Sequence, residues 1–252
     1  MKKFTTLLII TFTLTAALAA ADFSLSAGAG GYVGGLFTRY TLTAPGNIDG
    51  EPVNVKATQE MNQFNVGGFL FVDGTWAVFR LGIQRGTNNY KETMLATSPS
   101  IDDLTSTSQG KGSETMLNLT LLGKYPFTLN EQITLFPLLG MEYQIALAET
   151  REPNGRKRYD RTDGIRESSV KGDPYPLSVW NSLFAVVGAG LDYRIFSSMF
   201  LRTELLYSFR LQTPYEVDAL DKAKKGVNAP NPKLSGLTSG PSLSIAAGWR
   251  FY

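Results

Sequence analysis

The sequence predicts an all-β fold: an eight-stranded antiparallel transmembrane up-and-down β-barrel with short periplasmic turns and long extracellular loops. First, apolar residues occupy every second position in one segment after another, the period of a strand with one apolar face. Second, no stretch of about 18 consecutive apolar residues follows residue 21, which excludes membrane-spanning helices. Third, the connections between the alternating segments are short and long in turn, as in transmembrane barrels.

Residues 1–21 have the organisation of a cleaved Sec-type signal peptide. The basic start is Met1-Lys2-Lys3, the apolar centre is Phe4–Leu18, and the small-residue exit is Ala19-Ala20-Ala21. We therefore expect residues 22–252 to form the outer-membrane barrel domain. Without the leader the chain holds 22 basic and 22 acidic residues, because two of its 24 basic residues are leader lysines. A formal charge of zero does not favour a nucleic-acid partner.

Four strands are expected in the first half of the chain, near residues 22–40, 62–73, 75–90 and 113–127. The first is rich in glycine, and its alternation slips near Gly30-Gly31, which indicates a β-bulge or a close backbone contact. The apolar faces of the other three are, in order, Phe64, Val66, Leu70 and Val72; Ala77, Phe79, Leu81 and Ile83; and Leu117, Leu119, Leu121, Tyr125 and Phe127.

Four further strands are expected near residues 132–148, 179–195, 199–212 and 239–252. Their apolar faces are, in order, Ile133, Leu135, Leu139, Met141, Tyr143, Ile145 and Leu147; Leu183, Ala185, Val187, Ala189, Leu191 and Tyr193; Leu201, Leu205, Tyr207 and Phe209; and Leu243, Ile245, Ala247, Trp249 and Phe251. Short turns lie at 73–75, 128–131 and 196–198, the first with the Asp-Gly pair typical of a tight hairpin. Long polar loops are expected at 41–61, 91–112, 149–178 and 213–238.

The polar faces distinguish a membrane barrel from a soluble one. A soluble lipocalin-type barrel directs its apolar face inward, whereas a barrel in lipid directs it outward and keeps a polar interior. The expected interior contains small and charged groups, with five candidate lumen charges: Arg80, Glu142, Asp192, Arg202 and Glu204. Arg80 and Glu204 are expected near the bilayer midplane. Two interpretations stay open, an internal salt-bridge network that plugs the lumen and a narrow polar pore.

Aromatic residues gather near the strand ends, as in the interfacial girdles of membrane barrels. Together with the segments Gly188–Ile195, Phe200–Leu206 and Gly248–Tyr252, the pattern resembles the small outer-membrane β-barrels of the OmpX, OmpW and OmpA transmembrane-domain kind. The resemblance implies that the terminal aromatics Trp249, Phe251 and Tyr252 form a recognition signal for the barrel-assembly machinery. Tyr252 is one residue more than the alternating pattern requires.

The chain contains no Cys and no His, which excludes thiol catalysis, disulfides and His-based acid–base chemistry or metal sites. The enzymes among the barrels that this chain resembles rely on a catalytic His, so we expect no enzymatic activity, cofactor or metal. The densest basic segment is Arg156, Lys157, Arg158 and Arg161. It is either a solvated mixed-charge loop or a contact for anionic glycolipid headgroups or a host ligand.

The expected function is therefore that of a non-enzymatic, integral outer-membrane barrel with surface-exposed loops, serving adhesion, surface interaction or envelope structure. The alternative is a passive narrow channel of the OmpW kind for small or hydrophobic solutes, and a third class is a soluble periplasmic ligand-binding barrel. Expected partners are the lipid bilayer, outer-membrane glycolipids, the barrel-assembly machinery, and host or environmental ligands at the loops.

Overall fold

The computed structural model describes residues 24–48, 51–97, 104–153, 159–162, 177–212 and 233–251. Its elements are β1 (Leu25–Ile48), β2 (Glu51–Asp73), β3 (Ala77–Thr97), β4 (Leu104–Lys124), β5 (Phe127–Thr128), β6 (Ile133–Pro153), β7 (Tyr159–Thr162), η1 (Leu177–Trp180), β8 (Ser182–Arg194), β9 (Met199–Gln212) and β10 (Lys233–Phe251). In these ranges no helix is long and apolar enough to cross a membrane. The expected signal peptide, Arg156, Lys157, Arg158 and Tyr252 lie outside the described residues.

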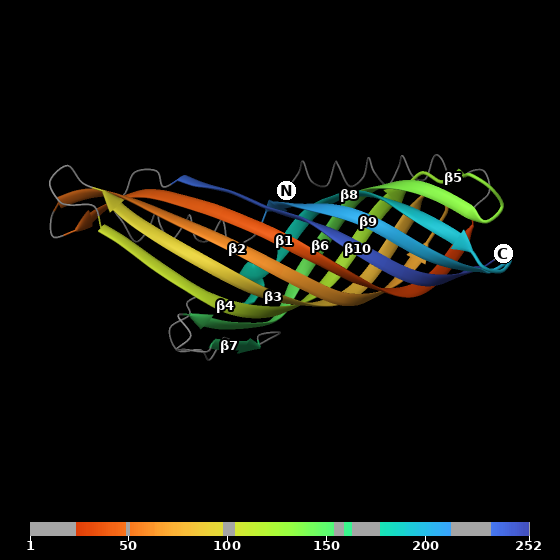
Figure 1. Ribbon diagram of the computed structural model, residues 1–252, viewed down its shortest axis with the longest axis horizontal. Coiled ribbons are helices and arrows are strands. Elements are labelled where there is room, and N and C mark those ends of the chain that lie inside the picture. The colour runs from red at the N-terminus through yellow and green to blue at the C-terminus, as the bar shows by residue number, and fades with distance from the viewer. Residues whose placement is uncertain are drawn as a thin grey trace.

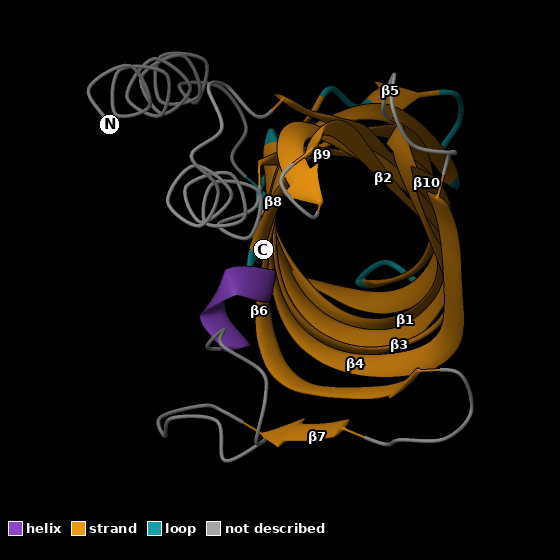
Figure 2. Ribbon diagram, turned by 90° about the vertical axis from the view of Figure 1, so that its left-hand side faces the viewer, coloured by secondary structure: helices purple, strands orange, loops and turns teal. Residues whose placement is uncertain are grey.

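Eight long strands close into a ring among the described residues (Figures 1 and 2). Their order is β1-β2-β3-β4-β6-β8-β9-β10, every neighbouring pair is antiparallel, and β10 pairs with β1. The short strands β5 and β7 both pair with β6. The predicted eight-stranded up-and-down barrel is thus confirmed. The turn end of the barrel carries the short connections, the N-terminal end of β1 and the C-terminal end of β10. The opposite end is the loop end.

The strands are staggered around the ring. Following directly paired residues once around the barrel from Ala27 on β1 leads back to β1 at Phe37, ten residues further along. Such a stagger tilts the strands of a barrel by about 35–45° to its axis. At eight strands the interior is just wide enough for side chains to fill it.

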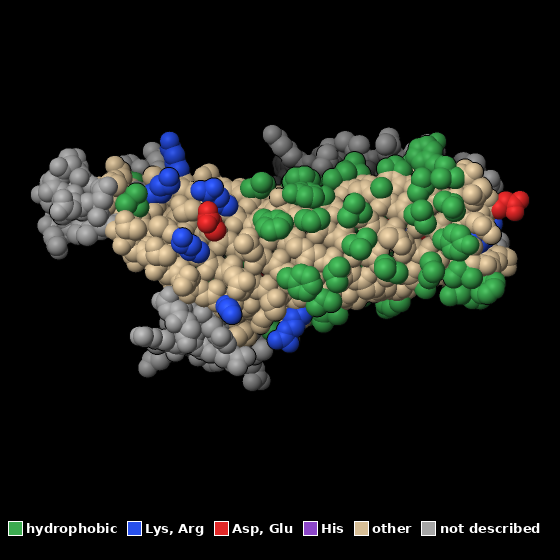
Figure 3. All heavy atoms as spheres, in the orientation of Figure 1, with side chains coloured by type: hydrophobic (Ala, Val, Ile, Leu, Met, Phe, Trp, Pro, Cys, Tyr) green, Lys and Arg blue, Asp and Glu red, His purple; other side chains and the backbone are tan. Residues whose placement is uncertain are grey.

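The outer surface carries a broad apolar band (Figure 3). On β1 its outward positions run from Leu25 to Phe37, and at about 3.3 Å per residue and a tilt near 40° they cover roughly 30 Å. Leu70 and Leu139, for example, expose 63% and 69% of their surfaces. The aromatics expected at the strand ends also face outward: Tyr125, Phe127, Tyr143, Tyr193, Phe196, Tyr207, Phe209, Trp249 and Phe251.

Two of the four segments expected to be long loops are mostly strand. β1 and β2 pair as far as Ile48 with Glu51, and β3 and β4 as far as Ala96 with Leu104, which corrects the loops expected at 41–61 and 91–112. These extensions project beyond the apolar band (Figure 1). In the extensions of β1, β3 and β4 both faces are mostly polar, so little alternation remains although backbone pairing continues, whereas on β2 Val53, Val55 and Ala57 still alternate with Asn54, Lys56 and Thr58. We call this projecting sheet the β1–β4 wall.

The expected bulge at Gly30-Gly31 is absent, because both residues stay in continuous register with β2 and β10. The other option, a close contact, is what the structure contains: a Cβ atom on Gly30 would collide with Ala246 and with the ring of Phe69. The register shifts lie elsewhere, between Thr115 and Met116 and between Leu183 and Phe184.

The interior is less polar than expected. Large apolar side chains fill part of it, chiefly Phe69, Phe71, Phe136, Phe184, Phe200, Leu122 and Leu138. The physical reason is that an eight-stranded barrel has no room for a water-filled lumen, so bulky groups must fill the space between the inward-facing glycines.

Candidate functional site: a charged plug across the lumen

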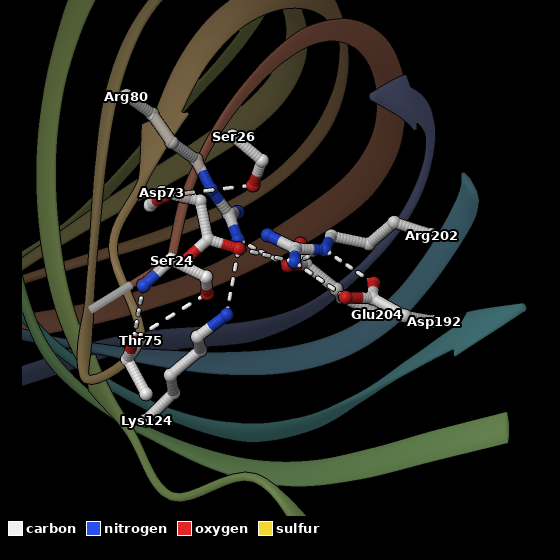
Figure 4. Close-up of polar contacts among 9 residues, drawn as sticks. All are labelled: Ser24, Ser26, Asp73, Thr75, Arg80, Lys124, Asp192, Arg202 and Glu204. Atoms are coloured by element: carbon white, nitrogen blue, oxygen red, sulfur yellow. Dashed lines mark hydrogen bonds and ion pairs between the residues drawn. The ribbon is translucent and has the colours of Figure 1, made fainter. Parts of the chain in front are cut away.

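Six charged side chains meet inside the barrel near its turn end (Figure 4). We call this cluster the lumen plug: Asp73 on β2, Arg80 on β3, Lys124 on β4, Asp192 on β8, and Arg202 and Glu204 on β9. Four of the five sequence-predicted lumen charges belong to it, and each is at least nine-tenths buried. The fifth, Glu142, lies outside the cluster, half-buried, where it accepts hydrogen bonds from Thr120 and Gln144 at 2.9 and 2.7 Å.

Arg202 is the centre of the plug. Its Nε and Nη2 atoms donate to the two carboxylate oxygens of Asp192 at 2.7 and 2.8 Å, a bidentate pair between neighbouring strands. Nη2 also donates to Asp73, which lies 129 residues away on β2. Lys124 donates to the same Asp73 oxygen at 2.7 Å. One guanidinium thus joins carboxylates from two sides of the lumen, with only 1% of its surface exposed.

Arg80 and Glu204 form the second part of the plug. Arg80 Nη2 donates to Glu204 Oε1, and Ser244 donates to the other carboxylate oxygen of Glu204 at 2.8 Å. Both residues lie at the depth of the apolar band, because their strand neighbours Leu81 and Leu205 face outward and are exposed. β3 and β9 are four strands apart in either direction around the ring. The pair therefore crosses the full diameter of the lumen.

Aromatic rings enclose the cations of the plug. The Arg202 guanidinium lies 4.9–5.2 Å from the ring centroids of Phe71, Phe136 and Phe200. Arg80 lies 5.1 Å from that of Phe69. These separations are within the range of cation–π attraction. The rings also occupy the space around the ion pairs, so charges and apolar groups together fill the cross-section of the barrel.

Sequence reasoning missed two members of the plug. Asp73 belongs to the predicted Asp-Gly turn, and Lys124 lies on the predicted inward polar face of its strand but is not among the five candidate lumen charges. The signal for Asp73 is the alternation of its strand. Asp73 follows the inward-facing Phe69 and Phe71 by an even number of residues, whereas the outward face is formed by Phe64, Val66, Leu70 and Val72. Period two alone therefore directs the Asp73 side chain inward.

A small polar cavity lies next to the plug on its loop side. Its volume is about 60 Å³, room for a few waters at roughly 10–15 Å³ each. Tyr32, Gln84 and Asn118 line it and bond to one another, with Tyr32 donating to Gln84 at 2.6 Å and Asn118 to Tyr32 at 2.7 Å. Arg80 and Glu142 also line it, so the plug forms one of its walls.

The other predicted site residues lie away from the lumen. Trp249 and Phe251 face outward at the turn end of β10, each about half exposed. Arg161 lies on β7, while the rest of its basic segment is outside the described residues. Across the described ranges no group of three or more acidic side chains is placed to hold a metal ion.

No protein-family model matches the chain, and no curated protein sequence matches it. Several solved structures are similar in fold at low identity. Ail of Yersinia pestis, in complex with the heparin analogue sucrose octasulfate, is 13% identical, with 90% of this chain and 99% of that chain covered and a TM-score of 0.30. Neisserial surface protein A is 11% identical over 87% and 95% of the chains, with a TM-score of 0.34. The outer membrane protein OprG from Pseudomonas aeruginosa is 12% identical over 89% and 97%, with a TM-score of 0.29. At these scores the fold assignment rests on the strand pairing of the chain itself.

Proposed function

We propose that this protein is a non-enzymatic barrel of the bacterial outer membrane that does not conduct solutes and presents the β1–β4 wall at the cell surface. The observation that carries the proposal is a barrel with an apolar exterior whose lumen is crossed by ion pairs between strands that lie three or four positions apart around the ring. The expected partners are the bilayer, its glycolipids, and a host or environmental ligand on the wall.

The outer surface supports the membrane location. A water-soluble protein rarely exposes an apolar patch beyond a few hundred Å², whereas here outward apolar side chains surround the barrel. The band's height of roughly 30 Å corresponds to the hydrocarbon core of a bilayer. A closed barrel leaves no backbone group unpaired toward lipid. The predicted signal peptide agrees with export, and the outward-facing Trp249 and Phe251 agree with a terminal assembly signal.

The lumen plug favours a closed barrel over a passive channel. Arg80, Arg202 and Glu204 are almost completely buried, and they are held by hydrogen bonds from several strands. Opening a path past them would separate charges in a low-dielectric interior, which is costly. The polar cavity beside the plug is small, and Arg80 forms part of its wall. Solute passage therefore has no support from the packing of the described interior.

Single-cysteine labelling tests the location and orientation, because the chain has no Cys of its own. We would express Asn89→Cys on the β1–β4 wall, Leu81→Cys in the apolar band and Asn130→Cys at the turn end in Gram-negative cells. A membrane-impermeant maleimide should label Asn89→Cys on intact cells, Asn130→Cys only after permeabilisation, and Leu81→Cys poorly in both. Equal labelling of all three, or release of the protein without detergent, would contradict the proposal.

A further inference from the structure

We propose that the outer face of the β1–β4 wall binds the phosphate groups of a phosphorylated glycolipid in the surrounding outer leaflet. The inference rests on the proposed membrane location. Figure 3 shows basic side chains gathered beyond the end of the apolar band on this face. The outer basic patch, as we define it, consists of Arg39 on β1, Arg85 and Lys91 on β3, and Lys111 on β4, all exposed.

The strand register brings the patch together. Glu60 on β2 is paired directly with both Arg39 and Lys91, so these two cations flank one carboxylate. Lys111 is paired with Asn89, which lies two residues from Lys91 on the same strand. Lys91 and Lys111 are therefore diagonal neighbours on the outer face, roughly 7–8 Å apart. Two ammonium groups at that spacing can approach one phosphate.

The charges of the patch are not balanced by the protein. Arg39 lies 3.4 Å from Glu60, but both side chains are more than half exposed. Within the described part of the chain, Arg85, Lys91 and Lys111 have no ion-pair partner. Lys111 is paired in register with Glu152 on β6, so four cations lie beside two acidic residues and the patch keeps a net positive charge. The exposed amides of Asn62 and Asn89 lie between them and add hydrogen-bond donors.

The patch also lies against the apolar band, which identifies the ligand as a lipid. Phe37 and Phe64, 57% and 58% exposed, lie on the neighbouring outer positions toward the turn end. Arg85 follows the outward-facing Ile83 by two residues, so its base lies within the band while its long side chain can extend toward the headgroups. Phosphates above and acyl chains below match this order of cations and apolar side chains.

Lipid retention by the purified barrel tests the inference. The protein is inserted into phosphatidylcholine vesicles that contain either bis-phosphorylated lipid A or its dephosphorylated form, extracted in mild detergent, and analysed for bound lipid by mass spectrometry. We expect the phosphorylated form to be retained selectively. Changing all four patch residues to Gln should reduce retention at least roughly tenfold, since each cation near a membrane surface contributes to anionic lipid binding.

Matched single variants provide the control. Lys111→Gln lies in the patch, whereas Lys56→Gln removes the same charge from the same wall four residues beyond Glu60, away from the band. Only Lys111→Gln should lower retention. Equal retention by wild-type and quadruple variant, equal loss in the two single variants, or equal binding of dephosphorylated lipid would overturn the inference. Failure to insert into phosphatidylcholine alone would instead overturn the proposed membrane function.

Discussion

Arg80 and Glu204 form an ion pair across the full diameter of the barrel, between two strands that are four positions apart in either direction around the ring. The pair is 124 residues apart in the chain. Together with the Arg202 cluster it connects strands from both halves of the sequence through the lumen. These ion pairs therefore link opposite sides of the barrel through its interior.

Removing the central guanidinium should destabilise the barrel strongly. Arg202→Ala leaves Asp192 buried without its bidentate partner and weakens the pairing of Asp73, so we expect a loss of about 3–5 kcal/mol in the free energy of unfolding. Urea unfolding in phospholipid vesicles, followed by the fluorescence of the three Trp residues, measures it. Arg39→Ala, which breaks an exposed pair, should cost less than about 1 kcal/mol. A similar loss in both variants would contradict a special role for Arg202.

A double-mutant cycle measures the coupling of Arg80 to Glu204. Arg80→Met strands a buried carboxylate, so it should cost about 3–5 kcal/mol. Adding Glu204→Gln removes that charge and keeps an acceptor for Ser244, so the double variant should be more stable than the sum of the single losses predicts. Strictly additive losses would show that the two side chains are not coupled in the folded barrel.

Gly190 should not tolerate a methyl group. A Cβ atom there would collide with the Phe136 ring and lie 3.0 Å from Cγ of Glu204, so Gly190→Ala should destabilise the barrel by about 1–3 kcal/mol. Gly31 faces outward and its nearest contact would be 3.5 Å away, so Gly31→Ala should change stability by less than about 0.5 kcal/mol. The same unfolding assay compares them, and equal effects would argue against ring packing on Gly190.

A charge placed on the apolar band should lower the free energy of unfolding, and the loss should be larger the closer the charge lies to the middle of the bilayer. Leu81 faces outward near the middle of the band, so Leu81→Arg should cost about 2–4 kcal/mol in vesicles. Asn89 lies on the outer face of the same strand but beyond the band, so Asn89→Arg should leave the free energy of unfolding nearly unchanged. If both variants were equally stable, lipid would not surround the band.

The fold was largely predictable, because lipid on one side and a filled interior on the other impose a strict alternation. The segment around Leu117 and Asn118 displays it directly, and period two places Asn118 inside, where it is found. The β3 extension was not predictable, since around Asn89 and Lys91 both faces are polar and no alternation remains, whereas Val53 and Val55 on β2 kept a signal of strand structure. Backbone pairing, which side-chain patterns do not report, decides the structure there.

The sequence predicts most of the residues of the candidate site, but it does not predict which of them pair with one another. The two-residue repeat of a strand places Arg80, Arg202 and Glu204 in the interior, because they alternate with outward-facing apolar residues. Which charges meet depends on the stagger of the barrel, which brings Asp73 from β2 to Arg202 on β9. The stagger is a property of the closed ring and leaves no signal in any single strand.

The current through planar bilayers that contain the purified protein tests the closed lumen most directly. We predict no unitary conductance steps for the wild-type barrel, and steps for Arg80→Ser combined with Glu204→Ser, which removes the pair that crosses the lumen. Reproducible steps in the wild-type protein that the double variant leaves unchanged would contradict the account, because solute would then pass without displacing the plug.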